Sequence, residues 1–321
     1  MKRILSGIQP SGQLHIGNYF GMMKTMIDYM ESSDLYVFIV DLHALTSVHD
    51  RDKLREGTLE AAADFLALGL DPDRCTFWVQ SDLPEVCELT WILSTLTPMG
   101  LLERCHSYKD KTAKGIAPSH GLFSYPVLMA ADILLFQSEV VPVGKDQKQH
   151  LEVARDIAIK FNNTFGETFV VPEPAINEGT AIVPGIDGQK MSKSYGNTIP
   201  IFIEDKPLRK LVMSIQTDST PVEEPKNPDT CNVFAIYNLL AEKDQVQQLR
   251  DKYLGGNYGY GHAKQELFEL ILEKFKNERE LFRKFMDDTR LLEEELQKGE
   301  EKARTIGSTV LDKVRKKIGY K

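Results

Sequence analysis

Two lysines three positions apart, Lys190 and Lys193, are well suited to bind a polyanion. They lie in the run Lys-Met-Ser-Lys-Ser, which has glycines on both sides. Glycine tolerates positive φ, so such a loop can change conformation. Two ammonium groups on it could close over phosphates and neutralise negative charge that develops during a reaction. Taken alone, a charged glycine-flanked loop is more often solvated surface, and a second signal is needed.

A second candidate is the pair His15 and Asn18, which belongs to the turn at residues 9–18. This turn follows the first apolar run, and a helix is predicted to begin near Gly17. In a doubly wound sheet the first strand-to-helix turn lies at the edge where ligands bind. The free N–H groups at the start of a helix also attract anions. His15 and Asn18 could therefore hydrogen-bond a phosphate or a base, although a lone histidine at a turn is more often a cap.

Asp132 is the third candidate, because it interrupts an apolar helical stretch at residues 129–134. Burying a carboxylate costs free energy unless a hydrogen-bonding partner compensates. The partner could be backbone N–H groups, which would make Asp132 structural. It could also be a polar atom of a bound ligand.

The elements that would position these residues alternate along the first two thirds of the chain. Strand patterns occur at residues 2–8, 35–40, 76–80 and 139–143. Helical patterns occur at about 17–31, 52–68, after Pro84, and at 126–137 and 147–161. Strand 35–40 is apolar throughout, as a parallel strand covered on both faces requires. The alternation predicts an α/β fold, a Rossmann-like doubly wound parallel sheet.

After Pro200 only helical patterns continue, so we expect a catalytic domain at residues 1–198 and an α-helical domain at 199–321. The net charge is −8, which excludes a basic nucleic-acid binder as a whole, but residues 302–321 form a locally basic segment. No apolar run is long enough to span a membrane, and residues 1–7 lack the apolar core of a signal peptide, so none is expected. The four cysteines lack metal spacing. A cytoplasmic protein is expected.

The His-Ile-Gly-Asn turn at residues 15–18 and the Lys-Met-Ser-Lys-Ser loop at residues 190–194 together resemble the paired signatures of class I aminoacyl-tRNA synthetases. Asn18 is the variant expected in the tryptophanyl branch of that family. Further blocks of the chain are similar to that branch in sequence and in order, namely residues 6–12, 39–44, 125–134 and 141–147. The resemblance implies a tryptophan–tRNA ligase: ATP and tryptophan form tryptophanyl-adenylate and pyrophosphate, and tryptophan then passes to tRNA. The attacking carboxylate is already an anion, so catalysis would be mainly positioning and charge stabilisation.

The resemblance also implies site residues for ATP and for catalysis. The catalytic set would be Lys190 and Lys193 on the pyrophosphate, His15 near the phosphates and Lys111 as a third cation. The ATP-binding set would be Gln9, Pro10, Ser11, Gly17, Asn18, Gly144, Lys145, Asp146, Val183, Lys190, Met191, Ser192, Lys193 and Ser194. Lys145 departs from the family pattern, in which an acidic residue is common. Any role of that side chain is therefore in doubt.

For tryptophan, the resemblance implies that Asp132 accepts the indole N–H, with Met129 against the ring and Gln147 and Tyr125 nearby. A site built to hydrogen-bond a polar substrate atom can discriminate by about 10⁴–10⁵. No separate editing domain would then be needed, and no segment of the chain is long enough to be one.

The resemblance further implies partners. Mg²⁺ would accompany ATP, the chain would form a homodimer, and the segment around 84–120 is a reasonable place for the interface. The helical domain would contact the anticodon side of tRNA, aided by the basic segment 302–321. Some relatives bind an iron–sulfur cluster through four cysteines in that domain. Only Cys231 lies there in this chain, so no cluster is expected.

Three alternatives stay open. A tyrosyl enzyme shares the fold and both motifs, and amino-acid-dependent exchange would distinguish it. A small-molecule nucleotidyltransferase can use a similar histidine turn, but the Lys-Met-Ser-Lys-Ser loop and the long helical tail argue against it. A non-catalytic binding module related to synthetases would show no exchange activity.

Overall fold

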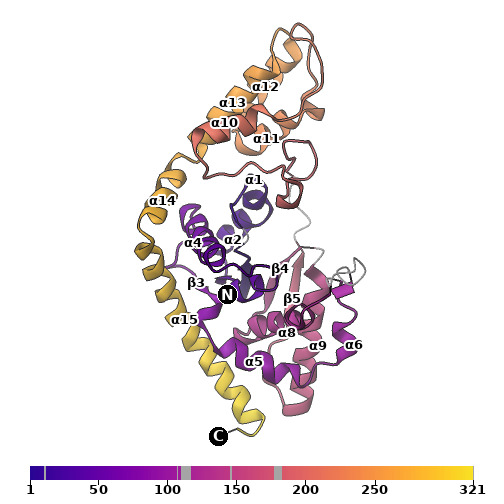
Figure 1. The fold of residues 1–321 in the computed structure, drawn as a ribbon, viewed down its shortest axis with the longest axis vertical. Helices are drawn as coiled ribbons and strands as arrows, with labels where there is room; N and C mark the ends of the chain where they lie inside the picture. Colours follow the sequence, from indigo (N-terminus) through magenta and orange to yellow (C-terminus); the bar gives the residue numbers. More distant parts are fainter. Residues whose placement is uncertain (11, 107, 110–116, 145–146, 177–182, 321) are drawn as a thin grey trace. The chain divides into compact units, whose positions relative to one another are not determined.

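A computed structural model describes residues 1–10, 12–106, 108–109, 117–144, 147–176 and 183–320 (Figure 1). The chain divides into two compact units. The sheet unit comprises Met1–Gly12, Met26–Glu178 and Phe285–Lys321. The helical unit comprises Gln13–Thr25 and Gly179–Lys284.

A five-stranded parallel sheet forms the centre of the sheet unit, with strand order β3-β2-β1-β4-β5. The strands are β1 Arg3–Ile8, β2 Asp34–Ile39, β3 Thr76–Val79, β4 Val140–Val143 and β5 Glu173–Ile176. The predicted doubly wound parallel fold and its four strands are confirmed. Strand β5 was missed because it is short and begins Glu-Pro. Such a strand is tolerated at an edge, where β5 pairs with β4 alone.

Helices cover the sheet, and their buried faces supply most of the core (Figure 1). They are α3 Asp41–Ala44, α4 Arg51–Ala67, α5 Glu85–Ser94, α6 Met99–Leu102, α8 His120–Leu135 and α9 Lys148–Phe165, with a 3-10 turn η2 at Gln80–Asp82. Helix α8 begins earlier than the predicted residue 126. The hydroxyl of Ser119 accepts a hydrogen bond from the Leu122 N–H and caps the helix, so Pro126 lies inside it.

Helix α15, Thr289–Lys317, belongs to the sheet unit and runs along β3 (Figure 1). Strand β3 is an edge strand, and α15 covers its edge. The approach requires a glycine: a Cβ on Gly299 would lie 1.6 Å from the Phe77 carbonyl oxygen. The compact units therefore differ from the predicted division at residue 198. Residues 285–321 join the sheet, while residues 13–25 and 179–198 join the helical unit.

Three basic side chains of α15 bind acceptors elsewhere in the sheet unit. Arg304 donates to both carboxylate oxygens of Glu85 at 3.1 Å. Arg315 Nε lies 2.8 Å from Glu88 Oε1, and Lys313 Nζ lies 3.1 Å from the Thr168 carbonyl oxygen. The basic segment 302–321, which was expected to aid tRNA contact, thus has several of its charges bound within the sheet unit. Sequence alone does not show these intramolecular partners.

The helical unit confirms the helical patterns predicted after Pro200. Its elements are α1 Ile16–Asn18, the π-helical η1 Tyr19–Met23, η4 Lys193–Tyr195, α10 Asp205–Met213, η5 Pro228–Thr230, α11 Asn232–Leu240, α12 Lys243–Gly255 and α13 Tyr260–Lys274. Two further helices cross the unit boundaries, α2 Lys24–Tyr29 and α14 Lys276–Asp287. Helices α10 and α11 pack on α13, and Leu208, Ile236 and Leu267 are fully buried there. None of the helices within the described ranges is long and apolar enough to cross a membrane.

Candidate active site

The two signature motifs meet inside the helical unit. The turn around His15 pairs with residues 199–201 in antiparallel fashion: the Ile16 N–H donates to the Ile199 carbonyl oxygen at 3.0 Å. The Gly17 N–H points at the Met191 sulfur, 3.3 Å away. A Cβ on Gly17 would lie 3.2 Å from Met191 Cβ, so glycine permits this close approach. The structure thus brings together two motifs that lie far apart in the sequence.

His15 and Asn18 cap the first helix with each other's side chains. The Asn18 N–H donates to His15 Nδ1 at 3.3 Å, and the His15 N–H donates to Asn18 Oδ1 at 3.3 Å. Burial, and then the positive charge of Lys193, lower the pKa of His15 to about 4. The ring is therefore neutral at pH 7. Because Nδ1 accepts a bond, its proton is on Nε2, which leaves Nε2–H as a donor for a phosphate oxygen.

The loop that carries the two lysines is built around a residue that sequence reasoning missed. Asn197 is 2% exposed. Its Oδ1 accepts from the Ser192 N–H at 2.8 Å, and its Nδ2 donates to Asp187 Oδ1 at 2.8 Å and to the Lys190 carbonyl oxygen at 3.1 Å. Gly185 is required here, since its Cβ would lie 2.4 Å from the Asn197 side chain. A flanking glycine predicted to give freedom of movement thus serves tight packing.

Met191 is buried and anchors the loop, whereas the two lysines of the loop are exposed to solvent. Met191 is 4% exposed, and its N–H donates to the carbonyl oxygen of Val183 at 2.8 Å. Lys190 and Lys193 are exposed on either side of it. The loop therefore presents two cations from an anchored backbone. Ser192 and Ser194 hydroxyls lie 2.8 Å apart beside them.

In the sheet unit, Asp132 is buried and bound by side chains. His43 Nε2 lies 2.9 Å from Asp132 Oδ2, and Gln80 Nε2 donates to Oδ1 at 2.8 Å and to Oδ2 at 2.9 Å. Burial raises the pKa of Asp132, while the hydrogen bonds and charge of His43 and the bond from Gln80 oppose that rise. The partners of Asp132 among the described residues are therefore side chains, not the backbone N–H groups that a purely structural role had suggested.

Tyr125 and Gln147, two further residues predicted to bind tryptophan, are linked through His150 beside this cluster. The Tyr125 hydroxyl contacts His150 Nε2, and His150 Nδ1 lies 2.9 Å from Gln147 Oε1. The His43 ring packs edge-on against Tyr125, with 6.1 Å between ring centroids. Met129 is partly buried on the same helix as Asp132. The structure adds His43, Gln80 and His150 to the prediction. Their signal in the sequence was weak: Gln80 directly follows β3, and His43 comes four residues after β2, at the edge where ligands bind.

The remaining predicted residues lie at strand ends or outside the described part of the chain. Gln9 and Pro10 follow β1, and Gly144 follows β4. These strands are neighbours at the point where the strand order reverses, which is where doubly wound sheets bind ligands. Ser11, Lys111, Lys145 and Asp146 lie outside the described residues.

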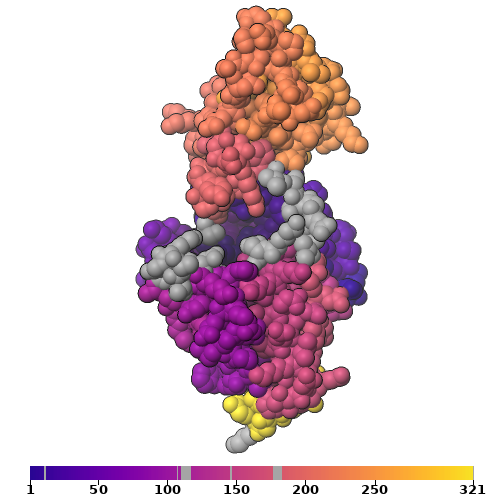
Figure 2. Space-filling view, turned by 90° about the vertical axis from the view of Figure 1, so that its right-hand side faces the viewer, coloured from indigo at the N-terminus to yellow at the C-terminus, as the bar shows by residue number. Residues whose placement is uncertain are grey.

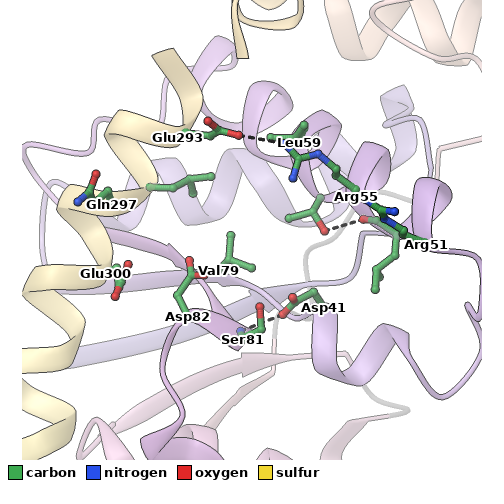
Figure 3. Close-up of a pocket in the computed structure, with 13 residues that line it drawn as sticks. Asp41, Arg51, Arg55, Leu59, Val79, Ser81, Asp82, Glu293, Gln297 and Glu300 are labelled. Carbon is green, nitrogen blue, oxygen red and sulfur yellow. Dashed lines mark hydrogen bonds and ion pairs between the residues drawn. The ribbon is translucent and has the colours of Figure 1, made fainter. Parts of the chain in front are cut away.

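A separate pocket of about 670 Å³ lies beside the ends of β2 and β3 (Figure 3). None of the predicted site residues lines it. Its walls carry Arg55 paired with Glu293 at 3.2 Å, and the carboxylates of Asp41, Asp82 and Glu300. Burial first, and then the charges of Glu300 and Asp41, raise the pKa of Asp82 to about 6. The motif residues therefore define the candidate active site better than this pocket does.

Comparison with known proteins identifies the class. A family model described as tRNA synthetases class I (W and Y) matches residues 1–276. Because this match covers most of the chain, the protein belongs to that family of class I aminoacyl-tRNA synthetases. Within the family, the chain shares high sequence identity with enzymes named tryptophan–tRNA ligase. A Fusobacterium nucleatum protein named tryptophan–tRNA ligase is 56% identical over 320 residues, covering 99% of this chain and 98% of that protein. One from Campylobacter jejuni is 54% identical over 317 residues, covering 99% of each.

Solved structures agree with this assignment. The tryptophanyl-tRNA synthetase of Campylobacter jejuni in complex with ADP and tryptophan has a TM-score of 0.96 at 54% identity, covering 99% of each chain. The enzyme of Mycoplasma pneumoniae has a TM-score of 0.81 at 29% identity, covering all of this chain and 98% of that one. A tyrosyl-tRNA synthetase from Archaeoglobus fulgidus shares only 19% identity, with a TM-score of 0.65. That likeness shows the common fold alone.

Proposed function

We infer that this protein is a tryptophan–tRNA ligase. It activates L-tryptophan with ATP to tryptophanyl-adenylate and pyrophosphate, and then transfers tryptophan to its tRNA in protein synthesis. One observation on the chain's own residues supports the choice of amino acid most directly. A buried carboxylate, Asp132, has hydrogen bonds from two side chains and an acceptor site left over for a ring N–H. The full-length identity to tryptophan–tRNA ligases agrees with it.

For activation, the exposed lysines Lys190 and Lys193 bind the phosphates of ATP and the leaving pyrophosphate. Neutral His15 donates its Nε2–H to a phosphate oxygen, and Gln9, Pro10 and Gly144 contact the nucleotide. The tryptophan carboxylate attacks the α-phosphate without a general base, because it is already ionised. The residues therefore act by positioning the reactants and by stabilising charge on the phosphates.

Mg²⁺ would accompany ATP rather than occupy a protein-built site. Among the residues that the structure describes, no three His, Cys, Asp or Glu side chains lie together as metal ligands. The side chains of the signature motifs are mainly lysines and hydroxyls, which suit phosphate oxygens. A hard cation such as Mg²⁺ takes oxygen ligands and commonly binds through substrate phosphates. No iron–sulfur cluster is expected, since Cys231 is buried with its sulfur 3.4 Å from the Tyr253 hydroxyl.

The test is ATP–pyrophosphate exchange with each of the twenty amino acids, on the parent and on Asp132→Ala. We expect tryptophan alone to support exchange in the parent, and the variant to lose it. Tyrosine-dependent exchange would assign the tyrosyl activity instead. A variant that keeps tryptophan-dependent exchange at the parental rate would show that Asp132 does not read the substrate. Asp312→Ala, which changes an exposed carboxylate of α15, is the control.

We also propose that the chain works as a cytoplasmic homodimer, with an interface in the segment 84–120. Two large apolar side chains of this segment are exposed: Trp91 by 70% and Met99 by 64%. In Figure 2 the described part of this segment is the purple area on the surface of the sheet unit. Contiguous exposed apolar surface is typical of interaction sites, and these two side chains are our candidates for such a surface. Sedimentation velocity should give a dimer for the parent and a weaker one for Trp91→Glu, whereas Val222→Glu, at a 51% exposed valine, should not matter.

The helical unit is proposed to contact the anticodon side of tRNA. A truncation is a poor test, because the helices of this unit pack on one another. Charge reversal at exposed positions of α12, such as Lys243→Glu, should raise the KM for tRNA and leave tryptophan activation unchanged. An unchanged KM for tRNA across several such reversals would argue against contact on this helix.

A further inference from the structure

Gln80 is a buried polar residue to which the family resemblance assigned no role. It is 2% exposed and follows β3 directly, at the start of the η2 turn. We propose that Gln80 is a positioning residue for tryptophan recognition: it orients the Asp132 carboxylate so that one oxygen can accept the indole N–H. This inference rests on the proposed role of Asp132.

The orientation of the Gln80 amide follows from its partners. Its Oε1 accepts from the backbone N–H groups of Leu42, at 3.1 Å, and His43, at 3.4 Å. Backbone N–H groups only donate, so the amide oxygen must face them. The NH₂ group then necessarily faces Asp132, to which it donates at 2.8 and 2.9 Å. The amide cannot flip without losing all of these bonds.

Counting acceptor sites shows what this arrangement leaves free. An ionised carboxylate offers about four acceptor sites, two on each oxygen. Asp132 Oδ2 receives bonds from both His43 and Gln80. Within the described part of the chain, Oδ1 receives one bond, from Gln80. The second site of Oδ1 suits a single N–H donor such as that of indole. Gln80 therefore fixes the plane and direction of the carboxylate by holding both oxygens, while His43 occupies Oδ2 and leaves the open site on Oδ1.

The two turns that carry this arrangement are tied to each other. Asp41 Oδ1 accepts from the Leu42 N–H and from the Ser81 N–H, both at 3.0 Å, and Figure 3 shows the second of these bonds. The turn after β2 and the turn after β3 are thus locked together. Gln80 is held at a fixed place by its own backbone and by its amide partners, as a positioning residue requires.

The experiment compares two substrates that differ in the ring N–H. Tryptophan and β-(3-benzothienyl)alanine have nearly the same shape, but sulfur replaces the N–H group in the second. In Gln80→Met, kcat/KM for tryptophan in ATP–pyrophosphate exchange should fall about 10- to 100-fold, the usual effect of losing a hydrogen bond to a charged group. The value for the analogue should stay within about 3-fold, because the analogue has no donor for Asp132.

Two further variants make the result decisive. Gln80→Glu keeps an acceptor for the Leu42 and His43 amides but replaces the NH₂ group with a carboxyl that must share a proton with Asp132. Asp132 then no longer presents the same free acceptor, so the preference for tryptophan should fall as in Gln80→Met. If Gln80→Met fails to fold, the measurement on Gln80→Glu alone tests the proposal. Gln137→Met removes another glutamine that bridges backbone groups, at Thr168 and Val170, and should leave the preference unchanged.

Equal losses for both substrates would mean that Gln80 is merely structural, and they would overturn the proposal. An unchanged preference in both Gln80 variants would overturn it as well. Asp132→Ala separates this outcome from a failure of the proposed recognition. If Asp132→Ala abolishes the preference while the Gln80 variants keep it, only the role of Gln80 is wrong. If Asp132→Ala also keeps the preference, the proposed reading of the indole N–H fails.

Discussion

The backbones of Gly299 and Phe77 are in direct contact: a Cβ built on Gly299 would lie 1.6 Å from the Phe77 carbonyl oxygen. Gly299 belongs to α15, and Phe77 belongs to the edge strand β3. No side chain could rotate away to relieve such an overlap, because the obstacle is backbone. The last helix of the chain is therefore an integral part of the sheet unit.

Gly299→Ala should lower the free energy of unfolding by at least about 3 kcal/mol, beyond ordinary overpacking, because α15 must move off β3. The matched control is Gly307→Ala in the same helix, whose Cβ would meet side-chain atoms alone, the nearest being Leu135 Cδ2 at 3.3 Å. Alanine favours helix there, so its effect should be within about 1 kcal/mol. Urea unfolding followed by circular dichroism measures both, and similar values for the two would contradict the packing argument.

Deletion of residues 302–321 should abolish tryptophan activation and not only tRNA charging. The deletion removes the buried residues Ala303, Leu311 and Val314, and each large one contributes about 1.5–3 kcal/mol. Deletion of residues 319–321 alone is the control and should leave exchange unchanged. Exchange activity that survives the longer deletion would mean that this end of α15 is dispensable for the sheet unit.

Gly17→Ala should reduce ATP–pyrophosphate exchange by about 100-fold, because the added Cβ pushes on Met191 Cβ at 3.2 Å and on His15 Nδ1 at 3.0 Å. Small displacements of catalytic groups have effects of that size. Gly21→Ala tests the specificity of the effect, since a Cβ there meets nothing within 4 Å. Equal losses in the two variants would point to helix distortion in general.

Lys193→Ala should slow adenylate formation about 100- to 1,000-fold while the Kd for tryptophan changes little, because the lysine acts on charge that develops at the phosphates. Rapid-quench kinetics and equilibrium dialysis measure the two quantities. Lys206→Ala, at an exposed lysine of α10, is the charge-matched control. A comparable loss of tryptophan affinity would mean that the loop has a structural role.

His15 should make the protein less stable as the pH falls. Its pKa is about 4 in the folded protein and 6.5 for an ordinary histidine, so the unfolded chain binds the proton more tightly. Stability is therefore fully present above pH 6.5 and falls between about pH 6.5 and 4, by no more than about 3 kcal/mol. His15→Gln should flatten the dependence of Tm on pH in this window, and His49→Gln, at an exposed histidine, should not. An unchanged slope in His15→Gln would place the acid sensitivity elsewhere.

The sequence by itself determined the class of the protein. Apolar strands alternating with helices predict a parallel sheet covered on both faces, since only that arrangement buries such strands. The His-Ile-Gly-Asn and Lys-Met-Ser-Lys-Ser motifs, with the blocks between them, carried the family and the reaction. Asp132 stood out because a carboxylate in an apolar helix needs a partner. These inferences depend on residue type and local spacing, which a sequence displays directly.

Only the tertiary structure showed which residues are the partners of Asp132. Asp132 receives hydrogen bonds from His43 and Gln80, which come from two other turns, and sequence spacing has no information on such contacts. The same holds for Asn197, whose side chain holds the lysine loop together, and for α15, whose basic residues were expected to aid tRNA contact. Their charges are bound by Glu85 and Glu88 of the sheet unit. Long-range packing decides whether a charge faces solvent or a partner, and that is a property of the folded chain alone.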